Sequence, residues 1–152
     1  MHRLLLLILL VFSQIALGQG IAKKNITAIR VSQAPKIDGI LDDAAWTNVP
    51  IASDFTAVEP IENIPSQQRT EVKVIYTDDA MYIGATMYDT NPELILKEIT
   101  QRDNTGNADI FGFFIDTYFD HQNLYKFQVT AAGVQIDDKL DIDNFNAIWQ
   151  NA

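Results

Sequence analysis

Residues 109–134 read DIFGFFIDTYFDHQNLYKFQVTAAGV, and this stretch decides the fold. Two runs rich in aromatic and β-branched residues, 110–115 and 124–129, flank a segment of turn-forming composition, Phe119–Asn123. Such runs on either side of turn residues predict two paired strands. Apolar side chains occupy both alternating faces of the first run, which predicts a strand covered on both sides.

A second hairpin is predicted upstream of this stretch. Residues 70–77 (TEVKVIYT) alternate between two faces, and residues 81–89 (MYIGATMYD) have the composition of a partner strand. Asp78-Asp79 lies between the two segments and suits a tight turn. Alternation on both sides of a short polar turn is the usual signature of a β-hairpin.

The remaining predicted elements are short. Strands are expected at 26–31 and within 51–59, and Trp46 is expected to bury its ring in the core. Residues 91–100 carry Pro92 near their start and then apolar residues at helical spacing, which predicts one short helix.

These segments together predict an all-β fold. We expect a sandwich of two antiparallel sheets, of jelly-roll or immunoglobulin-like type, with one short helix. Residues 147–149 resemble the start of another strand, and no closing element follows them. An unpaired hydrophobic edge is avoided in soluble proteins, so we expect the chain to be truncated at its C-terminus.

The N-terminus predicts export. A basic start at Met1–Arg3 and an apolar run at Leu4–Phe12 are followed by a small-residue site, Ala16-Leu17-Gly18, which indicates a signal peptide over residues 1–18. The apolar run is shorter than the ~20 residues that a transmembrane helix needs, so no such helix is expected. Residues 19–25 are then a linker, and residues 26–152 form one domain.

Composition limits the classes of partner. The 152-residue chain has no cysteine, so no disulfide stabilises it. Without residues 1–18 it keeps ten basic and 20 acidic residues, a net charge of −10. This charge argues against binding to nucleic acid and favours neutral ligands, cations or basic protein surfaces.

Several motifs, in order along the chain, resemble one family. The residues that carry the resemblance are Ile37–Trp46 (IDGILDDAAW), 70–76, 81–84 and 109–116, and their pattern is similar to carbohydrate-binding module family 9. A closer resemblance, to uncharacterised bacterial envelope proteins in which such a domain precedes a large C-terminal β-rich region, rests on segments 66–71, 102–103, 114–118 and 129–135.

The resemblance implies a β-sandwich of two antiparallel sheets and a non-catalytic, carbohydrate-binding-like module. Its host would be a secreted or envelope protein linked to carbohydrate catabolism, with any hydrolysis of O-glycosyl bonds carried out elsewhere. The implied partners are a polysaccharide or oligosaccharide and the C-terminal β-rich domain of the same protein. The implied location is the periplasm, the outer membrane or the medium of a bacterium.

Sugar-binding members of the family clamp a sugar between two tryptophans. When the chain is matched to the family on residues 109–116, one of these tryptophans falls near Gly106. A binding glutamate falls near Gly112 and a binding arginine near Gln128, so none of the three side chains is retained. These departures favour an alternative function, a structural or interaction sandwich that has lost sugar binding and docks a C-terminal outer-membrane-type domain.

A different aromatic platform is available near the hairpin turn. Tyr118 and Phe119 are the candidate stacking residues, because a sugar presents an apolar C–H face to an aromatic ring. Tyr125 is a third aromatic residue nearby, and we expect it to pack in the core or at a sheet edge. Gln128 and Asn107 complete the candidate ligand-binding set, because they lie at or beside positions matched to the family's arginine and tryptophan.

Calcium is the expected cofactor, since the family uses structural metal ions. Asp103 and Asp109 flank one loop, and Asp116 and Asp120 surround the hairpin turn. Loop carboxylates are the oxygen ligands that Ca²⁺ prefers. The alternative is that an acidic exported protein simply has acidic loops.

Catalytic chemistry finds little support. The absence of cysteine excludes a thiol nucleophile, and His121 is the only histidine after the predicted signal peptide. A hydrolase acting on O-glycosyl compounds needs two carboxylates that face each other across a cleft, and a sequence alone does not identify such a pair. We assign no catalytic residue, and a stand-alone hydrolase remains a third alternative.

Overall fold

The computed structural model describes residues 24–58, 60–61, 64–120 and 122–140. The predicted signal peptide, most of the predicted linker and the segment 147–149 lie outside the described residues.

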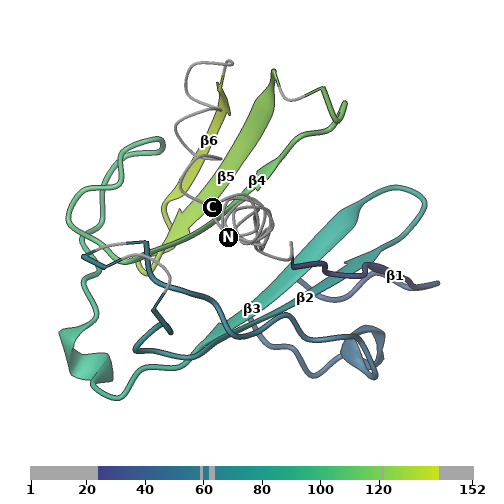
Figure 1. The fold of residues 1–152 in the computed structure, drawn as a ribbon, viewed down its shortest axis with the longest axis horizontal. Helices are drawn as coiled ribbons and strands as arrows, with labels where there is room; N and C mark the ends of the chain where they lie inside the picture. The colour runs from purple at the N-terminus through teal and green to yellow at the C-terminus, as the bar shows by residue number, and fades with distance from the viewer. Residues whose placement is uncertain (1–23, 59, 62–63, 121, 141–152) are drawn as a thin grey trace, which may run out of the picture.

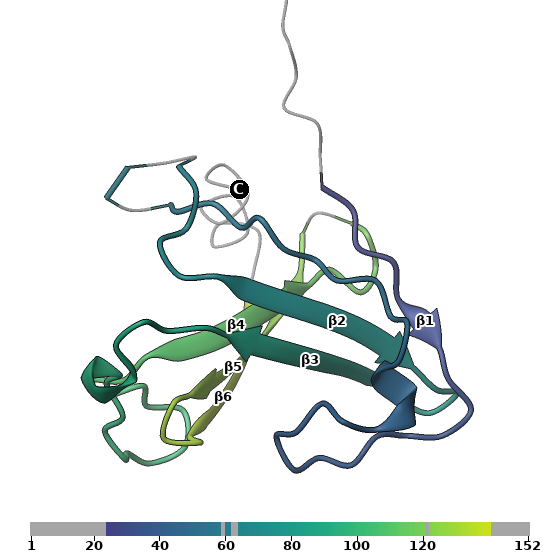
Figure 2. The same cartoon turned by 90° about the horizontal axis from the view of Figure 1, so that it is seen from below.

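Nearly all the regular secondary structure in the described chain is strand, which confirms the all-β prediction. The strands are β1 (Ile29–Arg30), β2 (Thr70–Tyr76), β3 (Met81–Met87), β4 (Ile110–Ile115), β5 (Leu124–Thr130) and β6 (Gln135–Leu140). They form two three-stranded sheets with the orders β1-β2-β3 and β4-β5-β6. Figures 1 and 2 show the sheets as separate layers whose strands are inclined to one another. The only helical elements in the described ranges are two 3₁₀ turns, η1 (Ala44–Trp46) and η2 (Pro92–Leu94).

The predicted hairpin of the first sheet is confirmed. β2 and β3 pair antiparallel from Thr70↔Met87 to Tyr76↔Met81. The predicted first strand is reduced to β1, and it pairs parallel to β2, so the expectation of purely antiparallel sheets is wrong here. A parallel pair needs a long crossover, which the segment between β1 and β2 supplies. The predicted strand within 51–59 is reduced to isolated bridges such as Ala52↔Val72.

The core of the first sheet forms around Trp46. The indole is 4% exposed and packs with Val49 and with Ile75, whose exposure is 0%. A Cβ added to Gly84 would lie 3.1 Å from Cη2 of Trp46 and 2.8 Å from Cδ2 of Leu41. The glycine therefore lets the ring rest directly on β3, and the predicted role of Trp46 as a core residue is confirmed.

The second sheet contains the stretch that decides the fold. β4 pairs antiparallel with β5, and β5 with β6. The rings of Phe113 and Phe127 stack across β4 and β5 with centroids 5.3 Å apart. The prediction that the first of these strands is covered on both sides is wrong, because Ile110 and Phe114 are 42% and 41% exposed. Both lie on one face of β4, which no described element covers completely.

The predicted helix over 91–100 is also wrong beyond its first turn. η2 ends at Leu94, and the chain after it is extended. Lys97 forms an isolated β-bridge with Ala108, and the Asp109 amide donates a 2.8 Å hydrogen bond to the Leu96 carbonyl. Leu94 and Ile99 are 71% and 83% exposed. The apolar spacing therefore does not create a buried face, and burial of such a face is what stabilises most short helices.

No helix within the described residues has the length and apolar character needed to cross a membrane.

Candidate functional site

The two candidate stacking residues lie at the turn between β4 and β5, with their side chains in solvent. Tyr118 is 75% exposed and Phe119 is 81% exposed. Phe119 has a positive φ of 53°, a conformation that few non-glycine residues adopt. Both aromatic side chains are therefore accessible to a ligand at this turn.

Asp116 and Asp120 build the frame of this turn. Oδ1 of Asp116 accepts a 3.2 Å hydrogen bond from the Asp120 amide. Oδ1 of Asp120 accepts bonds from the amides of Gln122 and Asn123 at 2.8 and 3.1 Å, and its Oδ2 accepts a 3.3 Å bond from Nδ2 of Asn123. The hydrogen bond from Gln122 is the main reason why the pKa of Asp120 is lowered, because bonds to the ionised form favour it. The two carboxylates thus serve as turn acceptors.

Asn107 lies in a loop whose shape depends on Gly106. Oε2 of Glu98 accepts a 2.7 Å bond from the Asn107 amide. Gly106 has a φ of +56°, and a Cβ there would lie 2.6 Å from Cγ2 of Thr100 and 3.0 Å from Oε2 of Glu98. A tryptophan at this position, as in the family's platform, would be strained and would clash with the loop.

Gln128 lies opposite Gly112 in the second sheet. The two residues are direct cross-strand partners of β4 and β5. A Cβ added to Gly112 would lie 2.7 Å from Cγ of Gln128. The positions matched to the family's binding glutamate and arginine are therefore adjacent, and the glutamine side chain fills the space above the glycine.

The predicted ligand-binding residues are not gathered in one place. Asn107 precedes β4, Gln128 lies within β5, and Tyr118 and Phe119 follow β4. The strand β4 alone spans roughly 20 Å at ~3.3 Å per residue, so Asn107 and the aromatic pair lie at opposite ends of the sheet. Of the four, only Tyr118 and Phe119 are neighbours in the chain, and both are exposed.

The four predicted metal ligands are divided in the same way. Asp103 and Asp109 lie before β4, and Asp116 and Asp120 lie after it, so the four cannot hold one ion. Oδ1 of Asp103 accepts a 3.3 Å bond from the Asp137 amide, and Oδ2 of Asp109 accepts a 3.4 Å bond from the Leu96 amide. Within the described ranges, no three His, Asp or Glu side chains are grouped to hold a metal ion. Calcium binding at either loop stays a prediction.

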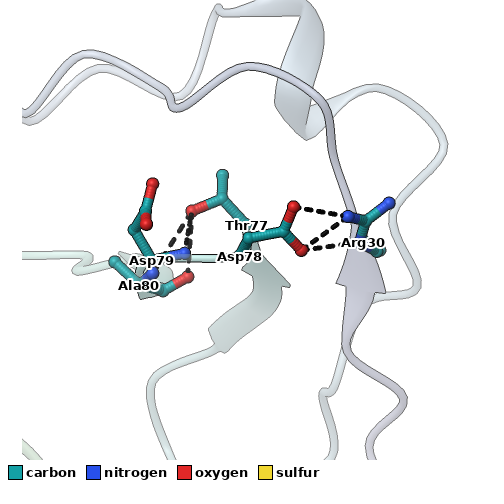
Figure 3. A network of polar contacts seen from close by, with 5 residues as sticks. All are labelled: Arg30, Thr77, Asp78, Asp79 and Ala80. Carbon is teal, nitrogen blue, oxygen red and sulfur yellow. Dashed lines mark hydrogen bonds and ion pairs between the residues drawn. The ribbon is translucent and has the colours of Figure 1, made fainter.

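A hollow of about 360 Å³ lies at a different place, between β1 and the β2–β3 turn. The parallel register sets Arg30 beside Tyr76, and its guanidinium reaches Asp78 two residues further on. Nη2 of Arg30 lies 2.5 and 2.7 Å from the two carboxylate oxygens of Asp78, and Nε lies 3.2 Å from Oδ1. Figure 3 shows this forked contact at the rim of the turn.

The β2–β3 turn next to this ion pair is fixed by Thr77. Its Oγ1 accepts bonds from the amides of Asp79 and Ala80 at 3.3 and 3.2 Å. In Figure 3 the Asp79 carboxylate points away from the contact between Arg30 and Asp78. Asp78 and Asp79 therefore do not face each other as the two carboxylates of a glycosidase would.

The sequence shows Asp78-Asp79 as a turn but does not indicate the hollow. Arg30 and Asp78 are separated by 48 positions, and only the parallel pairing of β1 with β2 brings them together. A two-residue strand carries too little pattern for its partner to be inferred.

Comparison of the chain with models of known protein families, with curated proteins and with solved structures finds no match.

Proposed function

We propose that this chain is a non-catalytic, carbohydrate-binding-like module of an exported bacterial envelope protein linked to carbohydrate catabolism. Its two sheets are the layers of a sandwich similar to carbohydrate-binding module family 9, and its ligand is a polysaccharide or oligosaccharide. The observation that carries the proposal is the exposed aromatic pair, Tyr118 and Phe119, at the β4–β5 turn.

The physical case rests on what these rings offer to a ligand. An exposed aromatic ring gains free energy when the apolar C–H face of a sugar covers it, and neighbouring polar groups can bind the hydroxyl rim. The hydrogen bonds to Asp116 and Asp120 fix the backbone of the turn. A fixed turn reduces the entropy lost on binding, which favours even a small contact surface.

The charge of the chain supports the same ligand class. A net charge of −10 after the predicted signal peptide repels anionic polymers and leaves neutral glycans unaffected. We therefore expect neutral polysaccharides to bind more tightly than uronic-acid polymers, and the difference to shrink as salt screens the charges.

A glycan-binding screen tests the proposal. The mature chain from Gln19 onward is screened first with calcium and then with chelator. We expect binding to at least one neutral glycan, with loss of binding in the Tyr118→Ala/Phe119→Ala variant. Phe55→Ala is the matched control, because Phe55 is also exposed (42%) and lies before the first hairpin. A folded chain that binds no glycan overturns the proposal, and loss of binding in chelator would assign calcium to the site.

A second function is favoured by a different observation. Ile110 and Phe114 are exposed on one face of β4, and the conformation of Gly106 excludes the family's platform tryptophan. A sandwich that has lost sugar binding would use this apolar face to dock the C-terminal β-rich domain of its own protein. Amide hydrogen exchange of the full protein, compared with this chain alone, tests the idea. Equal exchange rates in β4 for both proteins would exclude docking on this strand.

A further inference from the structure

The strand β3 forms the outer edge of the first sheet. It pairs with β2 alone in the order β1-β2-β3, and Figure 2 shows it on the side of β2 away from β1. On the inner side, Val72 of β2 exchanges backbone hydrogen bonds of 2.8 and 2.9 Å with Ala52, so its N–H and C=O point away from β3. The cross-strand partner of Val72 is Ala85, and its N–H and C=O therefore point away from β2. The alternate residues of β3 share this orientation, and they are Met81, Ile83 and Met87.

These outward backbone groups are open to a further strand. Within residues 24–58, 60–61, 64–120 and 122–140, no strand, bridge or loop bonds to the outer side of Ile83 or Ala85. The outer side of β6 differs, because the Gln135 carbonyl accepts a 3.1 Å bond from the Asp103 amide and Oδ1 of Asp103 accepts a 3.3 Å bond from the Asp137 amide. A row of unpaired N–H and C=O groups on an extended strand pairs with another extended strand. The edge of β3 therefore selects an extended peptide segment.

The side chains of β3 leave this edge unprotected. The strand (MYIGATM) contains no charged residue and no proline, the two residue classes that commonly protect an edge from pairing. Met81 and Met87 are 48% and 54% exposed and lie on the same face as Ile83 and Ala85. The opposite face carries the exposed Thr86. A partner strand with alternating apolar and polar residues matches these two faces.

Acidic residues stand at both ends of β3. Asp79 precedes the strand and Asp89 follows it, and both are exposed. The cation nearest to Asp89 in the sequence is Arg69 across the hairpin, whose guanidinium lies 5.2 Å from the centre of the Tyr88 ring and is paired with Glu71. Its charge is thus already compensated, and the two ends of the edge favour basic groups.

These charges distinguish between two kinds of partner. A second copy of β3 that paired antiparallel over all seven residues would place Asp79 opposite Asp89 of the other copy. Like charges opposite each other are destabilising, and two chains with a net charge of −10 repel as a whole. A strand with basic residues at both ends meets opposite charges instead.

We propose that the outer edge of β3 binds an extended segment of another protein as a fourth strand of the first sheet. The segment has alternating apolar and polar residues over the seven positions of β3 and a basic residue at each end. Its backbone bonds to the outward N–H and C=O groups of β3, and its basic residues lie beside Asp79 and Asp89. This interaction is independent of the proposed function, because it involves neither the β4–β5 turn nor a sugar.

An NMR titration of residues 19–152 with synthetic peptides tests the proposal. The probe is acetyl-KKVTVTVTVKK-amide, which has the required alternation and basic ends. One comparison peptide has glutamate in place of every lysine, and the other has proline in place of the second valine, which removes a backbone N–H. We expect the lysine peptide to shift the amides of Ile83 and Ala85 and to slow their exchange with solvent. The two comparison peptides should bind at least about tenfold more weakly, and salt should weaken binding of the lysine peptide.

Two variants locate the contact. Ala85→Pro removes one outward N–H and leaves the bonds between β2 and β3 in place, because proline is accepted on edge strands. It should abolish peptide binding while circular dichroism stays unchanged, and if it does not fold, the exchange rates in the unaltered chain still decide. Asp89→Asn should weaken binding about threefold, the size expected for an exposed ion pair. Asp42→Asn is the matched control, since it removes the charge of an exposed aspartate outside β3 and should not change binding.

The alternatives give different results. Slower exchange at Ile110, Gly112 and Phe114 would assign the peptide to β4 and overturn the site on β3. Equal binding of the lysine and glutamate peptides would overturn the basic partner. Shifts of Ile83 and Ala85 that depend on the concentration of the chain alone would show that a second copy occupies the edge, and would also overturn the proposal. The absence of a response to every peptide overturns it and leaves the outcome of the glycan screen unaffected.

Discussion

Gln128 lies directly over Gly112, its cross-strand partner, so closely that a Cβ on the glycine would lie 2.7 Å from Cγ of the glutamine. The next contacts are Nε2 of Gln128 and the Phe127 carbonyl, both at 3.3 Å. The two residues therefore share one space on the sheet. This relationship explains why a binding glutamate could not replace Gly112 without a change at position 128 as well.

A double-mutant cycle measures this dependence. Gly112→Ala should destabilise the chain because the flexible glutamine must move, and Gln128→Ala should remove most of that cost by removing Cγ. We expect a coupling free energy of about 0.5–1 kcal/mol from urea unfolding of the four proteins. Additive effects would mean that the two side chains do not compete for the same space.

Gly84→Ala tests the contact between β3 and the core. The added methyl group would meet both Leu41 and the ring of Trp46, and buried overpacking costs about 1–3 kcal/mol of unfolding free energy. Unfolding followed by tryptophan fluorescence should show the loss. The same substitution in a Leu41→Ala background should cost less, since the 2.8 Å contact is then absent. An equal cost in both backgrounds would contradict this packing.

Gly106→Ala tests the loop that carries Asn107. A left-handed backbone costs a non-glycine residue about 1–2 kcal/mol, and the methyl group would also press on Thr100. We expect a lower midpoint of thermal unfolding. Gly133→Ala is an informative comparison, because its φ is +82° but no atom lies within 4 Å of the added Cβ. Gly106→Ala should therefore be the more damaging of the two, and the reverse order would argue against the described loop.

The strands of both hairpins could be predicted from the sequence because their signals are local. Alternation in residues 70–76 and the polar turn at Asp78-Asp79 specify the register of β2 and β3 without knowledge of the rest of the fold. The same holds for β4 and β5. The helix expected over 91–100 failed because apolar spacing does not reveal whether a buried partner exists, and Ile99 instead lies 83% exposed.

The candidate sites show the same limit. Tyr118 and Phe119 could be named as candidates because they lie beside a polar turn, and the structure shows that both side chains are exposed. The contact between Arg30 and Asp78 was not predicted, because it depends on a parallel pairing across a long crossover. The crowding around Gly106 depends equally on side chains that only the folded loop brings together.

The pKa of Asp120 predicts a pH dependence of the β4–β5 turn. The pKa of Asp120 in the folded chain lies below that of an ordinary aspartate, so the ionised carboxylate stabilises the folded turn. This contribution is present above about pH 4 and is lost as the pH falls through the folded-state pKa. An NMR titration should show the amides of Gln122 and Asn123 shifting in that range, and Asp120→Asn should abolish the shift. A transition at these amides near neutral pH would contradict the assignment.

The most direct test of the proposed function measures the affinity for a neutral glycan identified in the screen. Calorimetry compares two proteins, the mature chain and its Tyr118→Ala/Phe119→Ala variant. Stacking on exposed aromatic rings predicts that the variant, still folded by circular dichroism, binds at least about tenfold more weakly, a loss of roughly 1.4 kcal/mol. Unchanged affinity in the variant would contradict the aromatic platform. Absence of binding by the unaltered chain to every neutral glycan tested would contradict the carbohydrate function itself.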